Sequence, residues 1–132
     1  MKVVLDTNVF NDWKFLEWLK ESNAEPLINT VTYSEYLYHI AKKIGNFEIA
    51  LDNFETLLWA VGIQVVSFDV ESARIVAQNV LGRWDFSKNA RDYMIGSLAI
   101  KLNAPLLTRN KKHFEWLPEV YTPAEFMEKF GE

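Results

Sequence analysis

The sequence predicts an α/β fold in which helices cover both faces of a central parallel sheet, giving three layers. Short apolar segments rich in β-branched residues alternate along the chain with longer segments whose apolar residues recur at helical spacing. Such alternation favours parallel strands joined by right-handed crossovers, in a sheet of about four to five strands. The chain has 132 residues, 49% of them hydrophobic, which suits one core, so we expect a single domain over residues 1–132.

The first half of the chain supplies two of the strands and three of the helices. Pro26 would prevent the first helix from continuing, and Gly45 and Gly62 are residues that typically end helices. The predicted strands are Lys2–Asp6 and Leu27–Thr30, and the predicted helices are Phe10–Ser22, a helix from Thr32 to the Gly45-Asn46 stop, and Phe47–Val61.

The second half repeats the alternation and carries clearer helix starts. Asp69 and Ser87 are good N-caps, and Thr122-Pro123-Ala124-Glu125 has the form of a capping box with proline at the first helical position. The predicted strands are Ile63–Phe68, Ala104–Thr108 and Glu119–Tyr121, and the predicted helices are Val70–Leu81, Ser87 to about Asn103 and one after Thr122, with a loop over Gly82–Phe86.

The composition excludes several classes of protein. The absence of cysteine excludes disulfides and thiolate zinc sites and suits a reducing compartment, so we expect a cytoplasmic protein. No apolar run approaches the length of a membrane span, and we expect no association with a membrane. The formal net charge of −4 argues against nucleic-acid binding through overall basicity, although it leaves room for a local basic rim.

Acidic residues follow predicted strands or open predicted helices at places far apart in the sequence. Asp6 follows the first strand, Glu35 follows the second, and Asp92 opens the helical run that ends near Leu102. In a parallel sheet, the carboxyl ends of the strands meet at one crevice. Carboxylates gathered there repel one another unless a cation holds them together. The pattern therefore predicts a metal-dependent hydrolytic site.

Each acid also has a simpler interpretation. Asp6 could cap the turn after its strand, and Thr32 and Glu35 satisfy the capping-box pattern, which taken alone is the better explanation of Glu35. Asp92 is harder to explain in this way, because it lies at the edge of the buried face of its helix, where a lone carboxylate is costly. Side chains of adjacent helical residues diverge, so Arg91 is a poor partner for Asp92, and a metal is the more economical one.

Four segments, in order, resemble the motifs of PIN-domain ribonucleases. The segments are Val4-Leu5-Asp6-Thr7-Asn8, Thr32-Tyr33-Ser34-Glu35, the run from Arg91 to Ala99, and the run from Leu107 to Phe114. Each segment is a weak signal alone, but the four in this order on an alternating strand–helix chain form a specific pattern. The resemblance covers essentially the whole chain and implies the PIN-like three-layer fold.

The resemblance also implies roles for individual residues. Asp6, Glu35 and Asp92 would be the catalytic acids that hold Mg²⁺ or Mn²⁺, since hard oxygen donors favour these ions over zinc. Asn8 and Thr108 would orient these acids without binding the metal themselves.

The fourth motif departs from the family pattern at one position. His113 stands where many family members carry an aspartate, which places a second metal in question. His113 either supplies an imidazole ligand or packs beside Phe114 and Trp116, while Asn110 can supply an amide oxygen. His39, in the middle of a helix, is expected at the surface rather than among the ligands.

An RNA substrate requires local positive charge on this acidic chain. Half of the 14 Lys and Arg residues fall between Arg83 and Lys112, and most of these flank the third and fourth motifs. Four of them are expected to position phosphates, which confers affinity but little choice of sequence: Arg91, Arg109, Lys111 and Lys112.

The resemblance further implies a biological role. Small PIN proteins of this length are most often VapC-type toxins, endoribonucleases that hydrolyse RNA phosphodiester bonds and pair with a short antitoxin, usually as homodimers. An alternative is a catalytically weak PIN domain that acts as an RNA- or protein-binding module. The presence of His113 in place of the usual aspartate is the feature that supports this alternative. A nucleotide-binding domain is a third interpretation, but no glycine-rich strand–helix loop supports it.

The first predicted helix carries more apolar residues than one core-facing stripe of about 100° needs. We expect it to form part of a protein–protein surface, with Trp13 off the centre of the buried stripe. The alternative is a thick core in which Trp13 packs under the loop after the third helix. The apolar residues of this helix are Trp13, Phe15, Leu16, Trp18 and Leu19.

Overall fold

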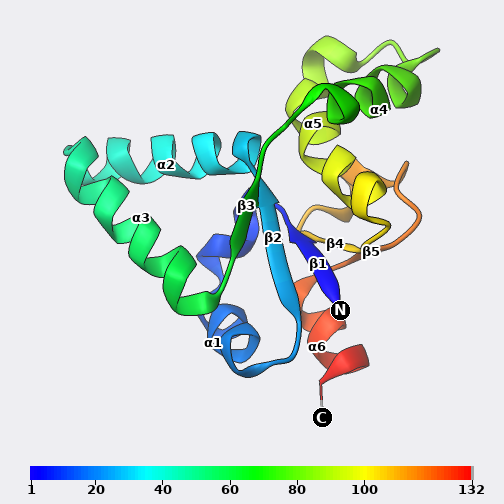
Figure 1. The fold of residues 1–132 in the computed structure, drawn as a ribbon. Coiled ribbons are helices and arrows are strands. Elements are labelled where there is room, and N and C mark those ends of the chain that lie inside the picture. Colours follow the sequence, from blue (N-terminus) through cyan, green and yellow to red (C-terminus); the bar gives the residue numbers. More distant parts are fainter. Residues whose placement is uncertain (132) are drawn as a thin grey trace.

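Five parallel strands form one sheet in the order β3-β2-β1-β4-β5 (Figure 1). The computed structural model describes residues 1–131, and Glu132, the last residue of the expected domain, lies outside the described residues. The sheet confirms the predicted α/β fold and its parallel strands. The strands are β1 (Lys2–Leu5), β2 (Glu25–Asn29), β3 (Gln64–Val66), β4 (Leu106–Leu107) and β5 (Val120–Tyr121).

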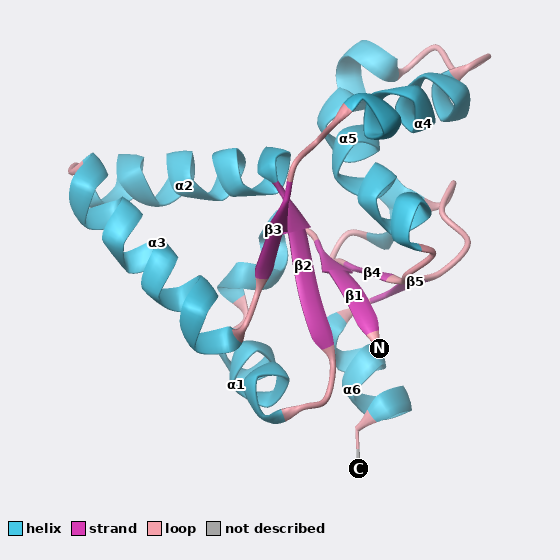
Figure 2. Cartoon of the chain, viewed as in Figure 1, coloured by secondary structure: helices cyan, strands magenta, loops and turns pink. Residues whose placement is uncertain are grey.

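Helices alternate with these strands and cover both faces of the sheet (Figure 2). Two short 3₁₀ turns, η1 (Thr7–Asn11) and η2 (Lys111–Phe114), follow β1 and β4. The α-helices are α1 (Trp13–Glu21), α2 (Thr30–Ile44), α3 (Phe47–Val61), α4 (Val70–Val80), α5 (Phe86–Leu102) and α6 (Pro123–Phe130).

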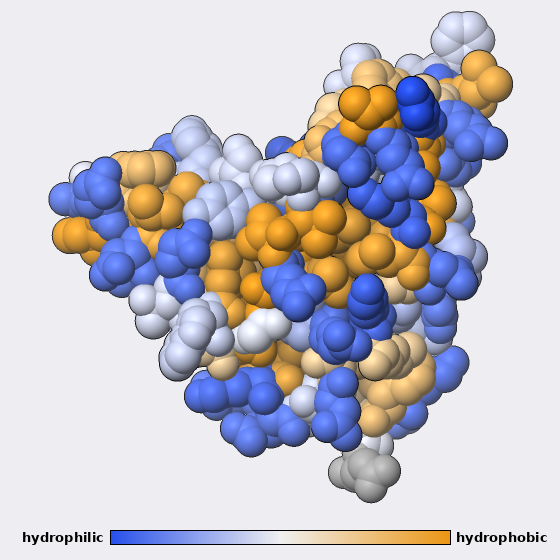
Figure 3. Space-filling model, in the orientation of Figure 1, coloured by the Kyte–Doolittle hydropathy of each residue, from blue (hydrophilic) through white to orange (hydrophobic). Residues whose placement is uncertain are grey.

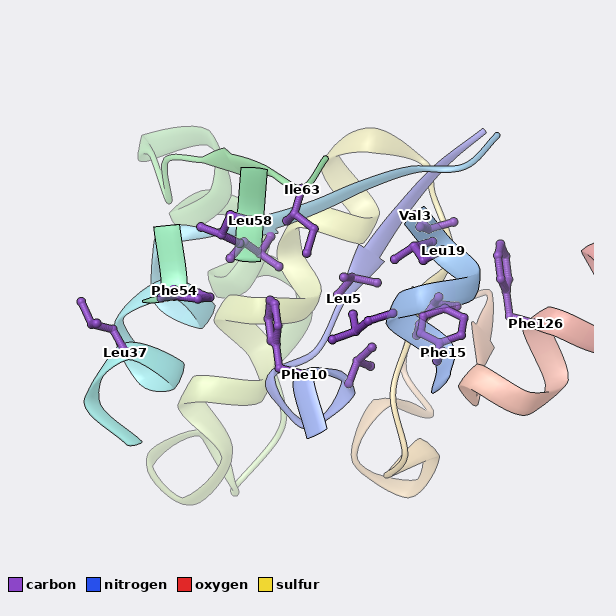
Figure 4. Close-up of a cluster of buried hydrophobic side chains, with 14 of the residues drawn as sticks. Val3, Leu5, Phe10, Phe15, Leu19, Leu37, Phe54, Leu58, Ile63 and Phe126 are labelled. Atoms are coloured by element: carbon purple, nitrogen blue, oxygen red, sulfur yellow. The ribbon is translucent and has the colours of Figure 1, made fainter. Parts of the chain in front are cut away.

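Buried side chains form a separate core on each face of the sheet. The larger core joins β1 to α1, α3 and α6, and its Phe10, Phe15, Phe54 and Phe126 are almost fully buried (Figure 4). The second core lies between the sheet and α5 and continues into the segment after β4. Because Val3 and Leu5 face one core and Val4 faces the other, β1 is apolar on both sides, as a central parallel strand must be.

Several helix starts differ from those that the sequence predicts. The first α-helix begins at Trp13 with Asp12 as N-cap, and Phe10 belongs to η1 instead. Pro26 lies within β2, and α1 already ends at Glu21. Asp85, not Ser87, occupies the N-cap position of α5. Two strands are also shorter than predicted: β3 and β4 cover only the middle of the predicted segments.

Other helix ends agree with the sequence. Asp69 accepts a hydrogen bond from the backbone N–H of Ser72 at the start of α4, and the Thr122–Glu125 capping box of α6 is complete. Gly45 and Gly62 end α2 and α3 with φ of 79° and 83°, a left-handed conformation that glycine adopts without strain.

Two pairs of helices project from the sheet. The α2–α3 pair extends to one side and the α4–α5 pair to the other, and the space-filling view shows apolar surface in the hollow between them (Figure 3). Among residues 1–131, none of the helices is both long and apolar enough to cross a membrane.

Candidate active site

Residues from four separate parts of the chain line one pocket of about 270 Å³ at the carboxyl edge of the sheet. Asp6 follows β1, Glu35 lies on α2 after β2, and Asp92 lies on α5. Asn110 and His113 come from the segment after β4. The structure thus brings together the three acids and the two further candidate ligands that the sequence singles out. Asn8 from η1 lines the same pocket.

Asp6 is the most deeply placed of the acids, with only 7% of its surface exposed. Its Oδ1 accepts a hydrogen bond from the backbone N–H of Thr7 (2.8 Å), and its Oδ2 accepts one from the Thr108 hydroxyl (2.8 Å). Burial raises the pKa of Asp6, while these two hydrogen bonds lower it and the nearby Asp92 and Glu35 raise it further. Asp6 is therefore a carboxylate for which a bound cation would be strongly favourable.

Thr108 is the centre of a small hydrogen-bond network that fixes Asp6. Its hydroxyl is fully buried and accepts from the Asn8 amide (3.3 Å) and from the backbone N–H of Asn110 (3.0 Å). The Asn8 side-chain oxygen in turn accepts from the backbone N–H of Arg109 (3.1 Å). Because Asp6 and Thr108 follow the neighbouring strands β1 and β4, pairing of these strands brings the two side chains together.

Glu35 is free to face the pocket because Asn29, rather than a Thr32–Glu35 capping box, caps the start of α2. Asn29 accepts from the backbone N–H groups of Val31 and Thr32, so the capping box expected from Thr32 and Glu35 is wrong. The Asn29 amide also donates to the Met94 carbonyl (2.9 Å), which ties the start of α2 to α5. The sequence pattern was misleading because the helix begins earlier, which leaves Thr32 buried within the first turn.

Two groups hold the Glu35 carboxylate. Its Oε1 accepts a hydrogen bond from the Thr7 hydroxyl, and its Oε2 lies 2.7 Å from Nε of Arg91. Neither contact is predicted by the sequence pattern. Thr7 lies next to Asp6 in the Asp-Thr-Asn segment, so the sequence offered a reason to include it among the site residues. Glu35 and Arg91 are far apart along the chain, and nothing in the sequence indicates that they pair.

Asp92 pairs with His113. Its Oδ2 lies 3.2 Å from Nδ1 of the imidazole, and the Asp92 side chain is largely buried. Burial raises the pKa of Asp92, and the charges of His113 and Arg91 oppose this shift. The His113 ring is half exposed and contacts Asp92 within the pocket, and the backbone carbonyl of His113 accepts a hydrogen bond from the Trp116 ring N–H (3.3 Å). His39 is exposed on the rim, as expected.

The chemistry of the pocket suits a hard divalent cation. Carboxylate and amide oxygens dominate the candidate ligands, and no ion pair satisfies Asp6 within the described residues. Across residues 1–131, however, no group of three acidic, His or Cys side chains is arranged to hold a metal. Two of the three acids are instead paired inside the protein, Glu35 with Arg91 and Asp92 with His113.

The four basic residues expected to position phosphates differ in whether they form an ion pair. Arg91 and Lys111 form ion pairs, Arg91 with Glu35 and Lys111 with Glu125 (3.0 Å). Arg109 and Lys112 are exposed, and in the described part of the chain neither forms an ion pair. Arg91 is the one of the four that lines the pocket of the acids, and Lys112 lines another cavity together with His113.

A larger cavity of about 660 Å³ lies elsewhere, between α1 and α6. Trp18, Phe126 and Phe130 line it, and Glu21 is its only acidic residue among the described ones. Among residues 1–131, its walls offer no cluster of groups comparable to the acids beside Asp6.

The fold is a parallel α/β/α sandwich with a group of acids at the carboxyl edge of its sheet, and the sequence assigns this α/β protein to a family. Residues 3–119 match the PIN domain family. The match covers most of the chain, and this protein belongs to the PIN domain family.

Solved toxin–antitoxin structures share the fold at low sequence identity. VapBC2 from Rickettsia felis, bound to a promoter DNA fragment, has a TM-score of 0.68 and 22% identity, covering 92% of this chain and 97% of that one. VapBC-1 from nontypeable Haemophilus influenzae has a TM-score of 0.72 and 22% identity, covering 94% and 99%. FitAcB from Neisseria gonorrhoeae has a TM-score of 0.66 and 21% identity, covering 92% and 98%. No curated protein matches the sequence.

Proposed function

We propose that this protein is a metal-dependent endoribonuclease of the VapC type, the toxin of a toxin–antitoxin pair. The observation that carries the proposal is the gathering of Asp6, Glu35 and Asp92 in one pocket at the carboxyl edge of a PIN fold. Three carboxylates in one small pocket repel one another, and a divalent cation is the simplest group that stabilises them together.

Asp6, Glu35 and Asp92 would hold Mg²⁺ or Mn²⁺, with Asn110 and His113 as further donors. When bound, such an ion would lower the pKa of a water molecule and neutralise charge on the scissile phosphate. The protein supplies the positions of these groups. Thr108 fixes the orientation of Asp6, and Asn8 fixes Thr108. Accurate positioning of this kind is a large part of catalysis.

Substrate binding would depend on the basic rim of the pocket. Exposed Arg109 and Lys112 would contact RNA phosphates, which gives affinity without base choice. Arg91 and Lys111 would also contact phosphates once they release Glu35 and Glu125, their ion-pair partners. The proposed cleavage of RNA would take place in the cytoplasm.

The proposed partner is a short antitoxin. The similar solved structures are VapBC and FitAB-type complexes, some of them bound to DNA, which supports a protein partner for this chain as well. Self-association into a homodimer is part of the same proposal.

The proposal is tested by cleavage of a labelled RNA with Mg²⁺ or Mn²⁺ present. Asp6→Asn and Asp92→Asn keep side-chain shape but remove the charge that holds the cation, so both should reduce cleavage at least about a hundredfold. Asp52→Asn is the matched control, since Asp52 is exposed on α3 away from the pocket. Equal activity in all four proteins would refute the proposal.

One observation favours a second candidate function, a PIN domain that binds RNA or protein without efficient cleavage. Glu35 and Asp92 are already paired with Arg91 and His113, so both are compensated without a metal. Metal-independent RNA binding without cleavage by the wild-type protein would support this alternative.

A further inference from the structure

The Arg91–Glu35 ion pair lies within the candidate metal site. Glu35 comes from α2 and Arg91 from α5, next to Asp92, and the two side chains meet at 2.7 Å. The Glu35 side chain is only 14% exposed, whereas 64% of the Arg91 side chain is exposed. A largely buried carboxylate is thus held by a guanidinium that can move away into solvent.

The pair sits where two cavities meet. Glu35 and Arg91 both line the 270 Å³ pocket of the acids and a second cavity of about 670 Å³, which extends along α2 to Phe68. Arg91 also lines a third cavity of about 310 Å³ with Lys88. Arg91 therefore has space to leave Glu35 without disturbing a packed core.

The charges explain why Arg91 would compete with a metal. A guanidinium and a divalent cation repel each other and seek the same carboxylate. Of the three acids, Glu35 is the one whose counter-ion carries a permanent charge, because arginine stays protonated. Asp6, in contrast, forms no ion pair within residues 1–131.

We propose that Arg91 is an internal counter-ion of the metal site, which holds Glu35 in the metal-free protein and competes with the divalent cation for its carboxylate. The inference rests on the proposed function, since it places the metal among Asp6, Glu35 and Asp92. Arg91 then lowers the affinity for the metal until it releases Glu35. Once released, its guanidinium is available at the rim for an RNA phosphate, so substrate binding favours metal binding.

The test is calorimetric titration of the metal-free full-length protein with Mn²⁺ alone. Arg91→Gln removes the charge beside Glu35 and should tighten Mn²⁺ binding about tenfold, the equivalent of losing one charge-assisted hydrogen bond. Arg91→Lys keeps the positive charge and should stay within about threefold of the wild type.

Lys88→Gln is the matched control. It removes the same charge from the same helix, but Lys88 does not contact Glu35, so Mn²⁺ affinity should change less than about twofold. Thermal unfolding in the absence of metal should show that all variants are folded, and added Mn²⁺ should raise the melting temperature most in Arg91→Gln.

Three results would overturn the inference, and only the third is also a failure of the proposed function. Equal or weaker Mn²⁺ binding by Arg91→Gln, with a wild type that binds Mn²⁺, refutes the competition alone. An equal gain in Lys88→Gln assigns the effect to overall charge. Absence of Mn²⁺ binding by the wild type and every variant refutes the metal site, and the inference with it.

Discussion

The Thr108 hydroxyl is the residue-scale feature on which the orientation of Asp6 depends. It donates to Asp6 and accepts from Asn8 and from the backbone of Asn110, all within a buried environment. We expect Thr108 and Asn8 to orient the acids, and the observed hydrogen bonds have the geometry needed for that role. The role itself stays a prediction.

Thr108→Val removes this hydroxyl while keeping the side-chain shape. We expect a loss of about 1–3 kcal/mol in the free energy of unfolding, because buried Asp6 Oδ2 loses its hydrogen-bond donor. Urea unfolding measures the loss. Thr56→Val, at an exposed position on α3, is the control and should cost far less. Similar losses in the two variants would mean that the network contributes nothing specific.

We expect His113 to influence which metal the proposed site prefers. His113→Asp replaces an imidazole donor beside Asp92 by a carboxylate, and Mg²⁺ accepts oxygen ligands more readily than nitrogen ligands. We expect tighter Mg²⁺ binding in the variant and a stronger preference for Mn²⁺ in the wild type. Metal titrations that coincide for the two proteins would place His113 outside the metal site.

At the scale of elements, the sequence indicates which segments are helices better than where they begin. Every strand and helix predicted from periodicity is present, because the alternation of apolar residues reflects burial on the sheet. Two of the misplaced starts have a similar cause: Asp12 and Asn29 cap α1 and α2, whereas the sequence pattern placed the helix starts at Phe10 and Thr32. Local patterns do not tell which of two adjacent caps tertiary packing will select.

Gly96 shows how closely α5 approaches the segment after η2. A Cβ at Gly96 would lie 2.7 Å from two atoms of the Trp116 ring and 3.3 Å from Leu117. Gly96→Ala should therefore destabilise the protein by about 1–2 kcal/mol, although alanine favours a helix by about 1 kcal/mol over glycine. In a Trp116→Ala background the same change should stabilise. Urea unfolding of the four proteins tests this, and an equal effect in both backgrounds would contradict it.

At the scale of the whole molecule, the convergence of the acids follows from the topology. Parallel strands direct their carboxyl ends to one edge, so Asp6 and Thr108 meet after β1 and β4, and the helix after β2 adds Glu35. This convergence could be predicted from the sequence. The pairing of Glu35 with Arg91 could not, because it depends on how α5 packs against α2.

Trp13 is the exposed aromatic residue that the sequence assigned to a protein–protein surface. Its side chain is 65% exposed at the start of α1, while Phe15, Leu16 and Leu19 are buried, so packing of Trp13 in a thick core is wrong. Trp13→Ala should leave the melting temperature nearly unchanged and weaken self-association, as measured by sedimentation. Trp59→Ala, exposed on α3, is the control. Unchanged self-association in Trp13→Ala would refute the proposed surface.

The central claim is that acids of the pocket hold a divalent cation for RNA cleavage, and metal removal tests it most directly. The measurement is the rate of cleavage of a labelled RNA by the wild-type protein, first in excess chelator and then after adding Mg²⁺ or Mn²⁺ beyond the chelator. The account predicts no cleavage in chelator and recovery with either ion, because in the proposed mechanism the cation held by Asp6, Glu35 and Asp92 activates the water. Full cleavage in excess chelator would contradict it.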